Sequence, residues 1–400
     1  MILTKRLRPE NQRASTLLAF ALIPLSGFAT DVYIPSLPTM AKDLQVIDIQ
    51  VQLTLSLFLI SYGVAQLFVG SLLDAFGRYR INIISLVIFA LASIVVANTA
   101  NIYLIYAMRI IHGITVGAIV VSKRAYIVDV YSGPQLKNYL SMFSIIWATA
   151  PIIAPFAGGY LQTYFGWHAN FYFLTAFAII ILLLELAFSG ETIKQKMPFN
   201  VKAISRVYIE MIGTTSFTLG IVMLGLSYSM VMIYNMTGPF IIEHKLGLTP
   251  VVAGYSSLIL GAAVMIGGLF GKATINRTFN KKLFINLGIQ SLFGVLMLAS
   301  TGIVSGLYAM VCFAFIIHAT SGYTFNSFFT YCLSRFPTHA GIAGGLTGGI
   351  NYVIVSFLSY TIISLVPAKD ETNLAYSYLI LIGLSILVMW IISRITDKRN

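Results

Sequence analysis

A carboxylate lies near the end of an apolar stretch at the start of the chain. Asp31 follows a largely apolar run that begins at Ala14, and Pro35 comes four residues later. An ionised carboxylate in hydrocarbon costs at least about 2.5 kcal/mol, so such a residue is usually protonated, paired or facing a water-filled cavity, and often carries protons or ions. Because proline removes a backbone donor, we expect the helix to end just beyond Asp31. The alternative is an aspartate at the water interface or at a helix cap.

A second charge within an apolar stretch complements Asp31. Arg109 lies about seven residues, or ~10 Å, from one end of its stretch, and Asp31 about five residues, or ~8 Å, from the end of its own. These matching depths predict that the Arg109 cation stabilises the ionised form of Asp31, or that the two exchange partners when a proton or substrate arrives. The alternative is a static ion pair that only offsets two buried charges. His112, one turn from Arg109, is a candidate proton relay or else a hydrogen-bonded packing residue. Glu185 is interpreted as a structural residue that reaches headgroup water.

Membrane spans are the elements that must position these charges. Hydrophobic residues make up 58% of the chain and charged residues 10%, with a mean hydropathy of +0.87, whereas about a quarter of the residues in a soluble domain are charged. Twelve apolar stretches are long enough to cross a hydrocarbon core of ~30 Å. They begin near residues 15, 51, 80, 102, 138, 169, 210, 251, 283, 308, 340 and 375. The sequence therefore predicts an all-α, multi-pass membrane protein of twelve transmembrane helices.

The distribution of basic residues predicts the orientation of these helices. If the N-terminus is cytoplasmic, 21 of the 25 Lys and Arg residues fall on the cytoplasmic side, and Arg109 lies inside a span. The three others, Lys42, Lys245 and Lys369, fall on the outer side. This positive-inside bias predicts that both termini are cytoplasmic. It also accounts for the net charge of +12 without a nucleic-acid partner.

The chain divides near its middle into two bundles of six helices. The predicted ranges are 1–190 for the first bundle, 191–208 for a polar cytoplasmic linker and 209–400 for the second bundle. A weak internal repeat supports the division, because an offset of 204 residues aligns Pro35 with Pro239 and Asp31 with Asn235. Two pseudo-symmetric six-helix repeats with a substrate site between them are a known transporter plan.

The turn after the second span carries a specific pattern. Gly77 permits a sharp reversal of the chain, and Asp74 can accept hydrogen bonds from a helix N-terminus or a basic side chain. This pattern resembles the cytoplasmic signature of the major facilitator superfamily (MFS), with two of its usual basic positions replaced. The resemblance implies that a latch at the inner gate is formed by Gly70, Asp74, Gly77, Arg78 and Arg80. The alternative is a solvated loop whose charges only set the topology.

The fifth span carries two prolines, which bend a helix, among small residues that allow close packing. Its pattern is similar to the antiporter motif that distinguishes exporters from uptake symporters in the superfamily. The residues concerned are Pro151, Ala154, Pro155, Gly158 and Gly159. The stretch from Arg109 to Gly113 also resembles a superfamily motif, with His112 in place of a glutamine. Together with segments 30–38, 166–168 and 336–341, these motifs resemble the bicyclomycin-resistance (Bcr/CflA) branch of twelve-helix drug:proton antiporters.

The resemblance implies a function. Members of this branch export small amphipathic compounds in exchange for protons by alternating access. We therefore expect a monomer in the bacterial inner membrane whose partners are the substrate, protons and the lipid bilayer, with no enzymatic activity, cofactor or metal. One alternative is a proton-coupled uptake symporter of the same fold, which the motif in the fifth span disfavours. A membrane-embedded sensor or enzyme would need an appended soluble domain or a catalytic cluster, and the sequence shows neither.

The substrate is expected to contact the first, fourth, seventh and tenth spans, which line the cavity in the superfamily. Their aromatic and polar side chains suit an amphipathic, partly aromatic ligand. The candidates are Phe28, Tyr33, Tyr106, Phe217, Tyr228, Tyr234, Asn235, His318, Tyr323 and Asn326. Since the chain holds 27 Phe and 22 Tyr, some must line any cavity, and the sequence does not specify the compound.

Overall fold

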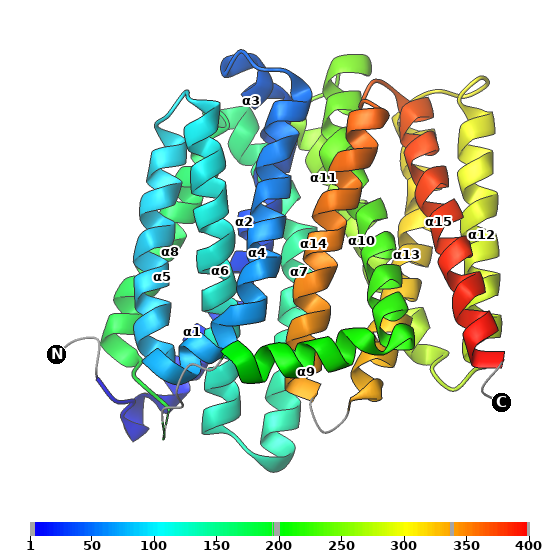
Figure 1. Ribbon diagram of the computed structural model, residues 1–400. Coiled ribbons are helices and arrows are strands. Elements are labelled where there is room, and N and C mark those ends of the chain that lie inside the picture. The colour runs from blue at the N-terminus through cyan, green and yellow to red at the C-terminus, as the bar shows by residue number, and fades with distance from the viewer. Residues whose placement is uncertain (1–4, 194, 196–200, 337–339, 398–400) are drawn as a thin grey trace.

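The computed structural model describes residues 5–193, 195, 201–336 and 340–397. Within these residues, eleven helical segments are long and apolar enough to cross a membrane. The helix α7 (Gly133–Phe165), 33 residues long, runs alongside them in the place of the fifth predicted span (Figure 1). The twelve predicted spans and the all-α membrane fold are therefore confirmed. Segments 194, 196–200 and 337–339, which include part of the predicted linker and of the 336–341 motif, lie outside the described residues.

The helices of the first half begin within a few residues of the predicted starts. Its first span, Pro9–Asp43, is followed by α4 (Asp48–Phe76), α5 (Arg78–Ala97), α6 (Ile102–Val130), α7 and α8 (His168–Phe188). The second half comprises α10 (Thr215–Phe240) with the π-helix η4 (Ile241–Lys245), then α11 (Pro250–Ala273), α12 (Phe279–Ser300), α13 (Leu307–Arg335), α14 (Ala340–Leu365) and α15 (Glu371–Asp397).

The first span is broken rather than ended near Asp31. It consists of η2 (Pro9–Asn11), α1 (Gln12–Leu22), α2 (Leu25–Asp31), η3 (Ile34–Ser36) and α3 (Leu37–Asp43). Pro24 and Pro35 lie at the two breaks, where a missing backbone donor interrupts the hydrogen-bond ladder. The helix that holds Asp31 therefore ends where Pro35 predicts, but the span does not, so Asp31 lies deeper in the span than the ~8 Å expected. Asp31 is the last residue of α2, and twelve further residues of the same span follow it.

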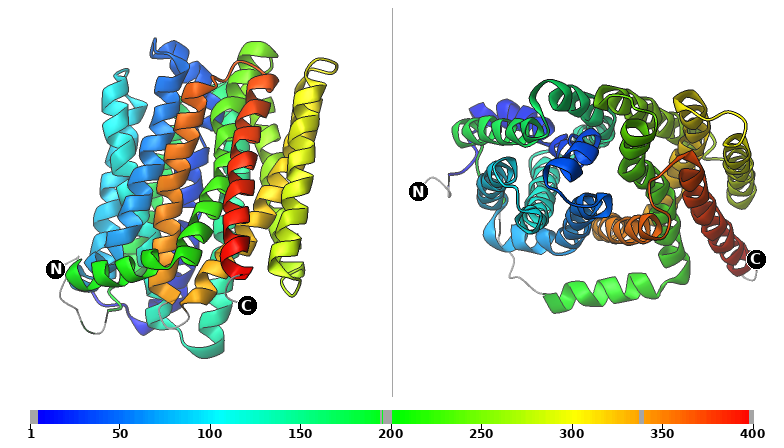
Figure 2. Two further views of the ribbon diagram at one scale, coloured as in Figure 1. Left: turned by 45° about the vertical axis from the view of Figure 1, so that its right-hand side comes forward. Right: turned by 90° about the horizontal axis from the view of Figure 1, so that it is seen from above.

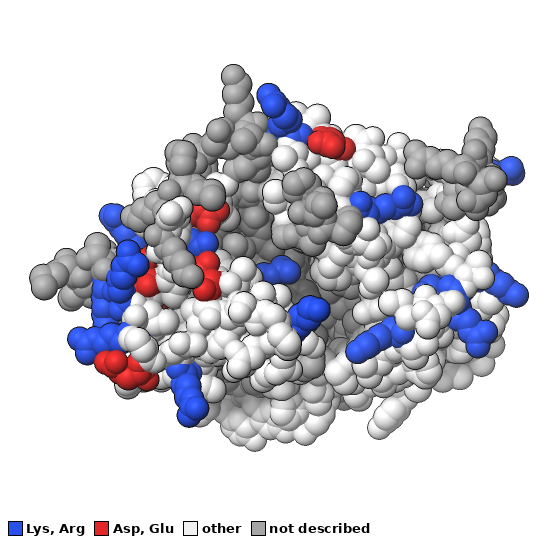
Figure 3. Space-filling model, turned by 90° about the horizontal axis from the view of Figure 1, so that it is seen from below, with Lys and Arg blue, Asp and Glu red and all other residues white. Residues whose placement is uncertain are grey.

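A helix also follows the part of the linker that is not described. The helix α9 (Val201–Gly213) lies at the lower end of the molecule in Figure 1, across the direction of the spans. The described helices α1 and α15 begin and end at this same end. We call it the inner end, because the segments here hold most of the Lys and Arg residues (Figure 3). The opposite end is the outer end.

Two pairs of helices make the most extensive contacts between the halves, α4 with α14 and α7 with α11. On the first contact, the Ser356 hydroxyl donates to the Ser56 carbonyl over 2.8 Å. On the second, the hydroxyls of Tyr160 and Tyr255 lie 3.0 Å apart near the outer end. Seen from the inner end, the surface is hollowed between the two halves, with Lys and Arg side chains beside the hollow (Figure 3). The outer ends are therefore packed together in this conformation, whereas the inner face is recessed.

Candidate functional site

Asp31 lies at the seam between the two halves. Its side chain is fully buried, and its Oδ1 accepts a long hydrogen bond of 3.4 Å from the Asn235 amide of α10. The other oxygen, Oδ2, has no hydrogen-bond partner among the described residues. Asp31 and Asn235, which the repeat aligns at equivalent positions, thus meet across the seam.

Arg109 is buried beside Asp31 and is held by the first half. Its guanidinium lies between the rings of Tyr33 and Phe58, 4.6 and 4.5 Å from their centroids. Nη1 donates to the Ala29 carbonyl over 2.9 Å, whereas Nη2 has no hydrogen-bond partner within the described part of the chain. The two side chains form no ion pair in this conformation, because Asp31 Oδ1 accepts from Asn235 and Oδ2 has no hydrogen-bond partner among the described residues. The cation is therefore stabilised by two aromatic faces and by the carbonyls of Ala29 and Thr54, and only Nη2 is left without a hydrogen-bond partner among the described residues.

His112 lies between Arg109 and Ser93. Arg109 Nη1 approaches His112 Nδ1 at 3.4 Å, and the opposite ring nitrogen lies 3.0 Å from the Ser93 hydroxyl. That hydroxyl in turn donates to the Phe89 carbonyl. Because Arg109 can only donate, Nδ1 acts as acceptor and Nε2 carries the proton towards Ser93. These contacts lie within the first half and do not include Asp31.

An aromatic cluster accompanies Asp31 at the seam. The ring of Tyr352 on α14 packs edge-on against Tyr62 of α4, with centroids 4.8 Å apart, and lies 6.1 Å from Tyr228 of α10. Asp31 is close enough to interact electrostatically with both Tyr228 and Tyr352. Sequence reasoning found Tyr228 but missed Tyr62 and Tyr352, because the chain holds 22 tyrosines and nothing in the sequence distinguishes these two. The cluster draws aromatic surface from both halves.

Other candidate cavity residues make contacts within their own halves. Phe28 packs against Phe173, 5.5 Å away, and the Tyr106 hydroxyl donates to the Gln50 carbonyl over 2.8 Å. In the second half, His318 bonds the Tyr378 hydroxyl at 3.0 Å and lies edge-on to Tyr234. Towards the inner end, the contacts are Phe217 with Phe336, Tyr323 with Thr274, and Asn326 beside Gly271. These side chains are therefore not gathered with Asp31 in this conformation.

The motif on α7 forms close backbone contacts on two sides. A Cβ at Gly158 would collide with the Val32 carbonyl of the first span. A Cβ at Gly159 would lie 2.7 Å from the Pro250 carbonyl at the start of α11. Ala154 is fully buried, and the Pro155 carbonyl lies 2.8 Å from where a Cβ of Gly254 would be. The small residues thus let α7 pack against its own half and against the opposite half.

The turn with the signature pattern is bound within the first half. Arg78 lies 2.5 Å from Asp129 of α6 and donates to Asp74 over 3.1 Å. Asp74 is half exposed, whereas Arg80 is exposed and Gly70 faces open space. Among the described residues, Asp74 forms a hydrogen bond and ion pair with Arg78 and none with α14.

Glu191, just after α8, was not singled out by sequence reasoning. Its carboxylate accepts the backbone amides of Arg78 and Tyr79, over 3.1 and 3.2 Å, at the N-terminus of α5. A carboxylate at this position also matches the helix dipole. Gly77 has φ of +102°, and a Cβ there would collide with the Glu191 carboxylate, so glycine is required on both counts.

A buried ion pair lies deeper in the first half. Lys123 Nζ lies 2.7 Å from both carboxylate oxygens of Glu185, and Asn82 donates to one of them over 3.2 Å. Glu185 is fully buried, so the expectation that it reaches headgroup water is wrong. The basic partner lies 62 residues earlier in the chain, on α6, and the sequence gives no sign of the pairing.

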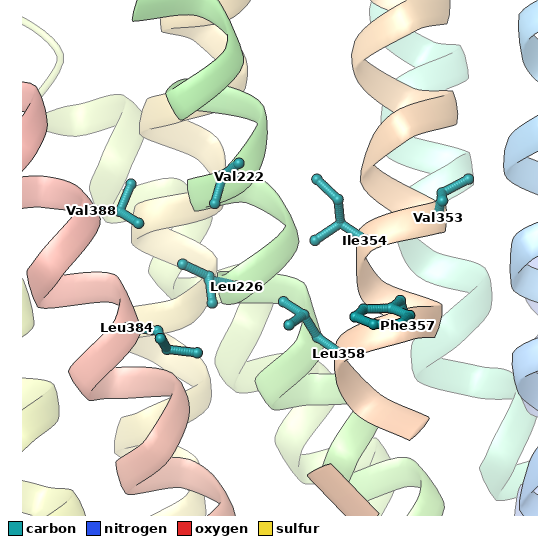
Figure 4. Close-up of a pocket in the computed structure, with 8 residues that line it drawn as sticks. All are labelled: Val222, Leu226, Val353, Ile354, Phe357, Leu358, Leu384 and Val388. Atoms are coloured by element: carbon teal, nitrogen blue, oxygen red, sulfur yellow. The ribbon is translucent and has the colours of Figure 1, made fainter. Parts of the chain in front are cut away.

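A further groove lies between α10, α14 and α15, with a volume of about 400 Å³ (Figure 4). Its lining consists of apolar side chains alone: Val222, Leu226, Val353, Ile354, Phe357, Leu358, Leu384 and Val388. Because it offers no polar group, it can solvate hydrocarbon but cannot orient a polar ligand or bind a proton. The seam at Asp31 is therefore the stronger candidate site.

Twelve spans in two halves that meet at a polar seam define a membrane transporter. Residues 19–360 match the model of the Major Facilitator Superfamily, and the chain belongs to this family. It is 26% identical over 364 residues to a bicyclomycin resistance protein homolog of Haemophilus influenzae, covering 89% of this chain and 91% of the relative. It is 25% identical over 376 residues to multidrug resistance protein D of Escherichia coli strain K12, covering 94% of each chain.

Solved structures share the fold. A D-xylose-proton symporter superposes with a TM-score of 0.70 at 17% identity, covering 94% of this chain and 96% of that chain. The inward-open xylose transporter XylE of E. coli superposes with a TM-score of 0.72 at 16% identity, covering 95% of each chain. At these identities the likeness establishes the arrangement of helices alone.

Proposed function

We propose that this protein exports small amphipathic compounds from the bacterial cytoplasm in exchange for protons. Two of its relatives carry names of resistance to bicyclomycin and to multiple drugs, and both align over about nine-tenths of the chain or more. The small residues of α7, similar to the antiporter motif, pack at the outer end against α11. Export by an inner-membrane protein with cytoplasmic termini follows from this reading and from the distribution of basic residues.

The observation that carries the proposal is the position of Asp31. It is a fully buried carboxyl group at the seam, with one long hydrogen bond from the opposite half and one oxygen without a partner among the described residues. Gain or loss of a proton changes the charge at this seam. Because an uncompensated charge is costly to enclose, the protonation state changes the free energy of packing the halves around Asp31. This links proton binding to alternation between the two faces.

Arg109 is proposed to compensate the charge of Asp31 when the proton leaves. Its guanidinium is stabilised by two aromatic rings and a carbonyl while Asp31 contacts Asn235. When Asp31 is ionised, Arg109 is the nearby cation that can compensate it. His112 holds Arg109 in place through its Nδ1 atom. In this scheme Asp31 carries the proton, Arg109 compensates the negative charge of ionised Asp31, and His112 positions Arg109.

The substrate is proposed to bind beside the aromatic cluster of Tyr62, Tyr228 and Tyr352. These rings come from three helices of both halves, so a ligand between them contacts groups that move relative to one another. Aromatic faces with hydroxyl edges suit a flat amphipathic molecule. The other candidates in α2, α6, α10 and α13 are proposed to reach the ligand in other conformations of the cycle.

The two faces are proposed to open alternately about the two halves, 1–190 and 209–400, joined by the segment 191–208. The glycine contacts of α7 with α11 close the outer end. The turn that carries Asp74 and Arg78 closes the inner end by contacting the N-terminus of α14 when the recess narrows. One copy of the chain contains both halves and is proposed to act as a monomer.

Transport in proteoliposomes with an imposed pH gradient tests the proposal. The probes are bicyclomycin and a set of aromatic amphipathic compounds, with protein-free liposomes and a protonophore as controls. An exchanger accumulates its substrate when the lumen is acidic, because protons leave as substrate enters. Accumulation driven by acid outside the liposomes would instead show a proton-coupled uptake symporter.

A further inference from the structure

The helix α9 occupies a position that the transport cycle described above does not use. It is 13 residues long and lies across the direction of the spans at the inner end (Figure 1). Seen along the spans, it lies beside the bundle rather than beneath it (Figure 2). A helix at the ends of the spans and outside their outline is at the level of the lipid headgroups, with acyl chains on one side and water on the other.

The side chains of α9 divide into two faces. Met211 is buried, and the Tyr208 hydroxyl donates to the Leu67 carbonyl of α4 over 2.8 Å, so one edge is fixed to the protein. Among the described residues, Ile209 and Ile212 are large apolar side chains left 71% and 43% exposed. On a regular helix, residue 212 points about 160° away from residue 210, which is a glutamate. The helix therefore offers an uncovered apolar edge and a separate polar edge.

We propose that α9 is an interfacial anchor that binds the inner leaflet of the membrane, with anionic phospholipid headgroups as its partner. Ile209 and Ile212 enter the boundary between headgroups and acyl chains. Arg206, which is exposed, lies one turn before Glu210 on the edge that faces the headgroups and water. Apolar insertion combined with a basic side chain is how amphipathic helices bind anionic membrane surfaces. The spans carry exposed large apolar side chains, such as Phe68 and Phe76 of α4, and α9 lies beside the bundle at their inner ends, so lipid is its neighbour.

Attachment of α9 to lipid also acts on the seam. Tyr208 binds the carbonyl of Leu67, and the Leu67 side chain packs where a Cβ of Gly349 on α14 would lie. At its other end, α9 is joined through Thr214 to α10 of the second half. The helix thus connects α4, next to its contact with α14, to the opposite half. Relative movement of the halves must carry α9 along the lipid surface, so lipid charge restrains that movement. This last step rests on the proposed transport cycle, whereas the anchoring does not.

Spin labels on the two edges of α9 test the anchoring directly. Ile212→Cys and Glu210→Cys are each labelled in a Cys312→Ser background, since Cys332 is buried. In nanodiscs with anionic lipid, we expect the label at 212 to be accessible to oxygen and protected from a water-soluble nickel chelate. The label at 210 should show the reverse. If both labels are equally accessible to the chelate, α9 stands in water and the proposal is wrong.

Charge reversal identifies the headgroup. We expect the label at 212 to be more deeply immersed when the nanodisc contains anionic lipid. Arg206→Glu should reduce this effect of anionic lipid by about fivefold or more, because it removes one basic contact and adds repulsion. Arg277→Glu is the matched control, since Arg277 is exposed on the turn between α11 and α12, away from α9. Unchanged lipid dependence in Arg206→Glu would show that anionic headgroups are not the partner. These readouts need no transport, so their outcome is independent of the export assay.

Discussion

Gly159→Ala should open the outer end of the transporter. The added Cβ would lie 2.7 Å from the Pro250 carbonyl and 3.2 Å from the Val251 Cα, both backbone atoms of α11 that no side-chain rotation can move away. The two helices must separate at this point. Since overpacking a close contact costs about 1–3 kcal/mol, and the contact exists only when the outer end is closed, the ratio of closed to open outer ends should fall about 5- to 150-fold.

Distances across the outer end report this shift. Spin labels replace Tyr103 at the start of α6 and Leu365 at the end of α14, which are exposed residues of opposite halves, in a Cys312→Ser background. Pulsed electron resonance should then show an added population at longer distance in Gly159→Ala. Gly288→Ala is the control, because Gly288 is also within a helix but has open space around it. If Gly159→Ala and Gly288→Ala give the same distance distribution as the wild type, the α7 contact does not close the outer end.

Three further predictions concern other parts of the first half. Arg109→Ala should reduce proton-driven transport more than Arg109→Lys, since lysine keeps a charge near Asp31 but loses the planar fork; equal, wild-type transport rates would make Arg109 purely structural. Asp74→Asn should leave the melting temperature nearly unchanged, because Asp74 in its ion pair with Arg78 is half exposed. It should increase several-fold the population whose inner-end spin labels lie at the longer, inward-open distance. An unchanged distance distribution would exclude a latch role for Asp74. Glu185→Gln should lower the free energy of unfolding by about 3–5 kcal/mol, and adding Lys123→Met should restore most of it; additive losses in this cycle would contradict a direct pair.

The sequence predicted the spans because hydrocarbon imposes a simple condition on every one of them. A span needs about 20 apolar residues whatever its neighbours are, so length and hydropathy are sufficient. The pairing of Asp31 with Asn235 was partly accessible too. Their offset of 204 residues puts them at equivalent places in the two repeats, and equivalent helices of two such halves face each other across the seam.

The parts that were missed depend on packing between distant segments. Tyr62 and Tyr352 lie 290 residues apart in the sequence and meet only because α4 crosses α14, and nothing local distinguishes them from the other tyrosines. Glu185 looked like an interfacial residue because its partner is on another helix. The helix α9 was hidden by the polar composition of the segment before it, although the helical spacing of Val207, Met211 and their neighbours would have indicated an amphipathic helix.

The central claim is that Asp31 couples protons to transport. The most direct measurement compares two activities of Asp31→Asn in the same proteoliposomes: exchange of labelled for unlabelled substrate, which needs no proton, and uptake driven by an acidic lumen. We expect exchange to persist and gradient-driven uptake to be lost, since asparagine fits beside Asn235 but cannot bind and release a proton. Asp43→Asn, at the exposed end of the same span, should retain both activities. Undiminished gradient-driven uptake by Asp31→Asn at equal protein content would contradict the account.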